Sequence, residues 1–142
     1  MNEQDNVATV KAVYAAFEQS DIPGLLEYLT PDIKWFAIGP PRVIPTAGTR
    51  YGRNQVAQYF SILAETEEIH SFEANEFIAD DNIVVAIGTL KTKLKETGKL
   101  LQTPWVHIFS FYHGKISEFR SFYDSDAAAE AHLNGHEMAA VR

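Results

Sequence analysis

The chain has 142 residues, 46% hydrophobic and 22% charged, which is typical of one folded globular domain over residues 1–142. Its net charge of −7 argues against a nucleic-acid partner, and the lack of cysteine excludes disulfides and thiolate chemistry. We expect no membrane helix, because no apolar run approaches the roughly 20 residues that one needs. The N-terminus MNEQDNVATV lacks the hydrophobic region of a signal peptide, so we expect a cytoplasmic protein.

The first part of the chain predicts two helices and a short strand. Apolar residues recur at three- and four-residue steps over residues 5–19, which predicts an amphipathic helix. Ser20-Asp21 is expected to end that helix and cap a second, shorter one that includes Leu29 and ends at Thr30-Pro31. Residues 33–38 then predict a strand that places Trp35 and Ala37 on one face.

A long irregular segment precedes the third predicted helix. Residues 39–52, GPPRVIPTAGTRYG, hold three prolines and three glycines, so we expect a loop without a regular element. Such a loop is either a functional rim or a cover over a sheet edge. Residues 53–65 return to helical periodicity, and Gly52, Arg53 or a capping Asn54 marks the start.

The rest of the chain predicts strands and a short final helix. Residues 69–79, 83–95, 100–111 and 116–124 have strand character, and polar turns join them. Gly88, in the middle of a strand, indicates a bend or a close approach of another group to the sheet. Residues 127–133 predict the helix. Three N-terminal helices on one face of a strongly curved, mixed and mostly antiparallel sheet give an α+β fold, a cone-shaped barrel with a pocket between the layers.

The stretch PWVHIFSFYHGKISEFRSFYDSD, residues 104–126, combines aromatic rings with two groups capable of acid–base chemistry. In its first strand His107 shares a face with Trp105 and other aromatics, so it is either a core histidine or a pocket residue. In its second strand Asp124 lies on the face opposite Tyr123. Asp124 either caps the helix that follows or, through a bulge at the strand's end, turns into the pocket, where burial would raise its pKa.

The order of the elements resembles the SnoaL-like, ketosteroid-isomerase-related branch of the nuclear transport factor 2-like superfamily. The resemblance covers roughly residues 7–133, and three segments carry it: VYAAFEQSDIPGLLEYLTPDIKW, AGTRYGRNQVAQYF and WVHIFSFYHGKISEFRSFYD. It implies a homodimer formed through the outer face of the sheet and a pocket for a small apolar or aromatic molecule. It does not select a reaction, because this superfamily hosts isomerases, dehydratases, epoxide hydrolases, cyclases and non-catalytic domains.

Carried over residue by residue, the resemblance is partial. The general-base aspartate of ketosteroid isomerases corresponds to Ala37, their oxyanion tyrosine falls one residue before Tyr14, and their protonated aspartate corresponds to His107. Limonene-epoxide hydrolases use an Asp-Arg-Asp set whose last member resembles Asp124, whereas residues 88–90 lack the other two. Cyclase-type relatives, with one acid/base aspartate at a position like Asp124, resemble this chain most.

We therefore expect a small-molecule-binding protein: an isomerase-, cyclase- or hydrolase-type acid–base enzyme, or a non-catalytic ligand-binding or dimerisation module. In the enzyme hypothesis Asp124 moves a proton and His107 hydrogen-bonds the substrate oxygen. The expected substrate-binding residues are Tyr14, Trp35, Phe60, Gly88, Trp105, Phe119 and Tyr123. We expect neither a metal nor another cofactor, because the histidines lack the spacing of metal ligands.

Overall fold

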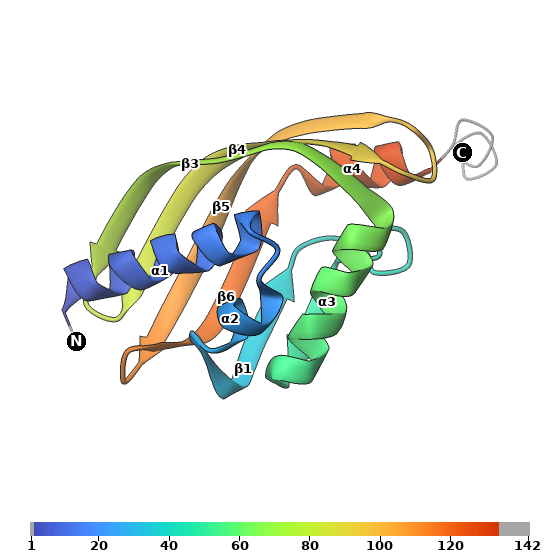
Figure 1. The fold of residues 1–142 in the computed structure, drawn as a ribbon. Coiled ribbons are helices and arrows are strands. Elements are labelled where there is room, and N and C mark those ends of the chain that lie inside the picture. Colours follow the sequence, from blue (N-terminus) through green and yellow to red (C-terminus); the bar gives the residue numbers. More distant parts are fainter. Residues whose placement is uncertain (1, 134–142) are drawn as a thin grey trace.

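The structure is a computed structural model that describes residues 2–133, and these residues form four helices and six strands (Figure 1). The elements follow in the order α1 (Glu3–Glu18), α2 (Ile22–Leu26), β1 (Leu29–Ala37), β2 (Gly48–Tyr51), α3 (Gly52–Thr66), β3 (Glu67–Asp80), β4 (Ile83–Leu94), β5 (Leu100–Tyr112), β6 (Lys115–Tyr123) and α4 (Ser125–His132). The strands form one sheet in the order β2-β1-β6-β5-β4-β3, in which only the β1–β6 pair is parallel. This confirms the predicted α+β fold with a curved, mixed sheet, which remains open.

The helices α1, α2 and α3 cover the concave face of the sheet (Figure 1). Buried apolar side chains from these helices meet those of β1, β4, β5 and β6 in one core cluster, which includes Val10, Val56 and Phe109. The last helix, α4, lies at one end of the sheet beside the turn between β4 and β5, where the Thr97 hydroxyl donates to the Ala131 carbonyl at 2.9 Å. The concave face is therefore enclosed by helices along its length and by α4 at one end.

Two local predictions about the first half of the chain were wrong. Helix α2 ends at Leu26, and Leu29 already belongs to β1, where it is fully buried. Pro31 lies inside β1, at a register irregularity between Leu29 and Lys34 in the pairing with β6. Proline has no N–H to donate to a neighbouring strand. It is tolerated here because the pairing with β6 is irregular at this place.

The segment 39–52 also contains a regular element that was not predicted. Residues Gly48–Tyr51 form β2, which pairs antiparallel with β1, so that Trp35 lies opposite Arg50. The partner strand supplies the hydrogen bonds for this short edge strand, and local composition does not reveal such a partner. The remaining irregular segment runs from residue 38 to residue 47.

The long strands curve where their pairing is irregular. Strand β3 has two register shifts, between Ile69 and Ser71 and between Ala74 and Glu76, and bulges of this kind bend a sheet. Gly88 of β4 lies opposite Ala74, and a Cβ atom added there would collide with the Glu73 carbonyl and the Trp105 ring. The close approach expected at Gly88 is thus made by a tryptophan. Among the described residues, no helix is both long enough and apolar enough to cross a membrane.

Candidate functional site

A pocket lies between the helices and the concave face of the sheet, and its wall is mostly aromatic. Its volume is about 110 Å³. This is smaller than the apolar cavity of about 150 Å³ that binds benzene, so a ligand with a ring would also have to extend toward the pocket's opening. The aromatic residues of the wall are Tyr14, Phe17, Trp35, Tyr59, Phe60, Phe72, Trp105, Phe109, Phe119 and Tyr123.

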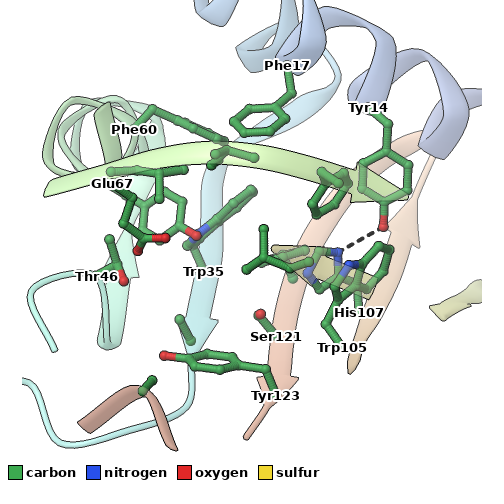
Figure 2. A pocket seen from close by; sticks show the side chains of 18 of the residues that line it. Tyr14, Phe17, Trp35, Thr46, Phe60, Glu67, Trp105, His107, Ser121 and Tyr123 are labelled. Atoms are coloured by element: carbon green, nitrogen blue, oxygen red, sulfur yellow. Dashed lines mark hydrogen bonds between the residues drawn. The ribbon is translucent and has the colours of Figure 1, made fainter. Parts of the chain in front are cut away.

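His107 and Tyr14 form a hydrogen-bonded pair in this wall. The Tyr14 hydroxyl oxygen lies 2.8 Å from Nδ1 of His107, joining α1 to β5 across the concave face (Figure 2). His107 is on the same face of β5 as Trp105 and Phe109, as the alternation of side chains along a strand requires. The open choice for His107 is thereby resolved: its side chain is buried and also lines the pocket.

Both members of the pair are neutral at pH 7. Burial lowers the pKa of His107 to about 3 and raises the pKa of the Tyr14 hydroxyl above its ordinary value. A phenol is a stronger hydrogen-bond donor than a neutral imidazole, and an imidazole nitrogen is the stronger acceptor, so we infer that the Tyr14 hydroxyl donates to Nδ1 of His107. In that arrangement the ring proton is on Nε2, and His107 presents a neutral N–H donor in the pocket wall.

The His107 ring is held by stacked aromatics. It lies over Trp105 with ring centroids 4.1 Å apart and an interplanar angle of 23°, and Trp105 is in turn stacked on Phe72 at 4.8 Å and 7°. The Trp105 ring occupies the space that the missing side chain of Gly88 leaves. Gly88 is therefore not a wall residue, and its contribution to the site is to let Trp105, and through it His107, lie close to the sheet.

Glu67, Tyr59 and Tyr123 form a second polar group in the pocket. Burial raises the pKa of Glu67, and the Thr92 hydroxyl acts in the opposite direction. Burial and the nearby Glu67 carboxylate together raise the pKa of Tyr123 to about 12. Burial raises the pKa of Tyr59 as well, with smaller contributions from Glu67 and Tyr123. Figure 2 shows Glu67 across the pocket from Tyr14 and His107.

The model of the SnoaL-like domain family matches residues 10–119. The chain belongs to the SnoaL-like domain family. No curated protein gives a significant match to the sequence.

Solved structures of this fold extend over nearly the whole chain. An NTF2-like protein from Burkholderia xenovorans LB400 is 31% identical, with a TM-score of 0.86 over 94% of this chain and 99% of the other. TerC, crystallised with polyporic acid, is 23% identical, with a TM-score of 0.80 over 90% of this chain and 98% of the other. A protein from Mesorhizobium loti assigned to the SnoaL-like polyketide cyclases is 21% identical, with a TM-score of 0.68 over 82% and 97%. The last two likenesses show the shared SnoaL-like fold alone.

Asp124, the acid/base residue expected from the cyclase-type members of the SnoaL-like family, lies outside the pocket. Its carboxylate accepts a hydrogen bond from the Ala127 backbone N–H at 3.0 Å and caps α4. Its own N–H donates to the Thr103 hydroxyl at 3.0 Å, and its side chain is exposed. Asp124 therefore caps the helix and does not turn into the pocket. Strand β6 ends at Tyr123 without a bulge that would turn Asp124 inward.

The other predicted binding residues of this SnoaL-like domain lie in the pocket wall: Tyr14, Trp35, Phe60, Trp105, Phe119 and Tyr123. Among the polar residues of the wall, sequence reasoning missed Thr46, Tyr59, Glu67, Ser121 and His132. Ser121 follows from alternation, because it lies between Phe119 and Tyr123 on their face of β6. Glu67 had no such signal, since it lies between the predicted helix 53–65 and the predicted strand 69–79, whereas β3 begins at Glu67.

The segment 38–47 is part of the pocket wall. Ile44 and Thr46 line the pocket, which favours the functional rim over the simple cover. Arg50 holds this segment in place by donating to the Thr46 carbonyl at 2.8 Å and the Pro45 carbonyl at 3.1 Å. In the described part of this SnoaL-like domain, no three histidine or acidic side chains are grouped as metal ligands would be.

Proposed function

We propose that this SnoaL-like protein binds a small apolar or aromatic carbonyl compound and acts on it by acid–base catalysis. The Tyr14–His107 pair supports the proposal: a neutral N–H donor on Nε2, fixed by a buried hydrogen bond, in the wall of an aromatic pocket. A neutral imidazole can stabilise an enolate oxygen by hydrogen bonding without first losing a charge of its own. Isomerisation and aldol-type cyclisation of carbonyl compounds pass through an enolate and their hydrolysis passes through a tetrahedral oxyanion, so all three reactions gain from a donor at this oxygen.

Proton transfer needs a second group. Since Asp124 caps α4, the carboxyl that lines the pocket among residues 2–133 is Glu67. Burial raises its pKa toward neutral pH, which favours proton exchange with a substrate. In the proposed reaction Glu67 accepts a proton from a carbon or oxygen atom conjugated with the carbonyl group. The resulting charge then moves to the oxygen held by His107.

Binding and chemistry can be tested separately. Acetophenone and 2-acetonaphthone are titrated into the wild-type protein and into His107→Leu by isothermal titration calorimetry. We expect binding that weakens about fivefold to tenfold in the variant, the effect of one lost hydrogen bond. Tyr112→Phe, at an exposed tyrosine, is the matched control and should bind like the wild type. Equal affinity in wild type and His107→Leu would contradict the assignment of His107.

Catalysis is tested by deuterium incorporation into 3-methylcyclohex-2-enone in D₂O, followed by proton NMR. This compound has exchangeable hydrogens conjugated with its carbonyl group, so exchange reports proton abstraction without knowledge of the physiological substrate. We expect exchange above the buffer rate in the wild type, lowered at least tenfold in His107→Leu and in Glu67→Gln. Binding without exchange would instead support a non-catalytic ligand-binding module, which the position of Asp124 outside the pocket favours as the second candidate.

We also propose that the protein forms a homodimer through the outer face of the sheet. Half-buried apolar side chains gather there, on the face opposite to His107: Val85, Ile87, Val106, Ile108 and Phe122. A dimer mass in light scattering after size-exclusion chromatography is expected, and Ile108→Lys should convert it to a monomer with unchanged circular dichroism. A monomer mass for the wild type at roughly 100 µM protein would contradict the proposed homodimer.

A further inference from the structure

Away from His107, the pocket wall contains three polar side chains on three different elements. Glu67 begins β3, Tyr59 belongs to α3, and Tyr123 ends β6. All three side chains line the pocket, and burial, followed by the charge of Glu67, raises the pKa of both phenols. We call these three residues the distal polar site.

Two aromatic rings separate the distal polar site from His107 along the wall. The Tyr59 ring lies 5.4 Å from Trp35, Trp35 is stacked on Phe119 at 3.9 Å, and Phe119 lies 4.8 Å from His107, all measured between ring centroids. Figure 2 shows Glu67 and His107 on opposite sides of the pocket. A ligand that reaches both is therefore about as long as one or two rings with their substituents.

The distal polar site is rich in hydrogen-bond donors. The phenols of Tyr59 and Tyr123 remain protonated at neutral pH, because burial raises the pKa of each. Tyr59, Tyr123 and Glu67 all line the pocket, so an oxygen atom of a ligand at this end meets two phenol donors and one carboxyl acceptor.

We propose that the distal polar site binds an oxygen substituent of the ligand at the end opposite to the one held by His107. This inference rests on the proposed function, because it assumes a first oxygen at Nε2 of His107. It narrows the ligand class to flat ring compounds that carry a carbonyl group at one end and a hydroxyl or second carbonyl at the other. A ligand hydroxyl accepts a hydrogen bond from the phenol of Tyr59 or Tyr123 and donates one to the carboxylate of Glu67.

Two pairs of probes test the inference, each pair differing by one hydroxyl group. They are acetophenone with 4-hydroxyacetophenone, and 2-acetonaphthone with 6-hydroxy-2-acetonaphthone, which together span the two possible lengths. In calorimetry on the wild type, we expect the hydroxylated member of at least one pair to bind about fivefold tighter. Glu67→Leu should reduce this ratio to about one, whereas Glu65→Leu, at an exposed glutamate two residues away, should leave it unchanged.

Further variants separate the two proposals. His107→Leu should weaken both members of a pair and preserve their ratio, because the two ends of the ligand are bound independently. Tyr123→Phe removes one donor from the distal polar site, and we expect an intermediate ratio even if Glu67→Leu folds poorly by circular dichroism. A ratio of one for both pairs in the wild type, or an unchanged ratio in Glu67→Leu and Tyr123→Phe, would overturn the distal polar site. Failure of both parent ketones to bind would overturn the proposed function itself.

Discussion

At the scale of single residues, the chemistry of this protein depends on which polar groups are inside the pocket. His107 is buried among Trp105, Phe109 and Phe119, and the cost of burying a charge keeps its imidazole neutral. Tyr14 forms a hydrogen bond with one of its two ring nitrogens, so the other is the nitrogen proposed to bind a ligand. The pair is therefore a fixed hydrogen-bond donor, and a general acid based on an imidazolium is not expected at this position.

Tyr14→Phe tests the importance of the pair for stability. The change leaves Nδ1 of His107 buried without its donor, so we expect the free energy of unfolding to fall by about 1 to 3 kcal/mol. Chemical denaturation measures this loss. Tyr112→Phe removes a hydroxyl from an exposed tyrosine and should change the free energy of unfolding by less than about 0.5 kcal/mol. Equal effects of the two substitutions would argue against the hydrogen bond.

At the scale of elements, the junction of β6 and α4 determines the role of Asp124. Tyr123 is the last residue of the strand and faces the pocket, and the next residue begins the cap of α4. The Asp124 carboxylate is then needed by the unpaired N–H groups of the helix's first turn. Capping the helix and acting in the pocket are incompatible uses of one short side chain.

Replacement of Asp124 distinguishes these two roles. Asp124→Ala should lower the free energy of unfolding by about 1 kcal/mol, and Asp124→Asn by less, because asparagine is also a good N-cap. Neither should change the affinity for acetophenone or the rate of deuterium exchange. Thermal unfolding and the two assays of the proposed function measure these effects, with Asp126→Ala as a control in the same helical turn. Loss of exchange in Asp124→Asn, with stability retained, would restore the catalytic hypothesis.

At the scale of the whole molecule, the buried titratable groups affect the pH dependence of stability with opposite signs. The pKa of His107 is about 3 in the folded state and near 6.5 in an unfolded chain, so the unfolded state binds more protons below pH 6.5. Its contribution is complete above pH 6.5 and is lost as the pH falls toward 3. Glu67 has a raised pKa in the folded state, so its destabilising effect is present at high pH and relieved as the pH falls.

Two variants isolate these contributions. His107→Gln should make the free energy of unfolding less dependent on pH between 7 and 5, where one histidine contributes up to about 1.4 kcal/mol per pH unit. Glu67→Gln should have its most stabilising effect at pH 8 and a smaller one at pH 4. Urea denaturation across this range provides the data, and His113→Asn, at an exposed turn histidine, is the control. A wild-type pH slope in His107→Gln would mean that His107 titrates normally.

The sequence alone determined the features that follow from local periodicity. Alternation along β5 placed His107 on the same face as Trp105 and Phe109, because side chains of a strand point alternately to its two faces. Helical spacing likewise placed Tyr14 on the buried side of α1, and the glycine at position 88 indicated a close contact. These features required no knowledge of distant partners.

Only the tertiary structure determined which polar groups meet. Tyr14 and His107 are 93 positions apart in the chain, and their hydrogen bond depends on how α1 lies across the sheet. Strand β2 forms because its backbone pairs with that of β1. Glu67 lines the pocket because β3 begins directly after the end of α3. Asp124 caps a helix because of the residue at which β6 ends. Periodicity assigns a residue to a face, whereas packing between distant segments determines what that face meets.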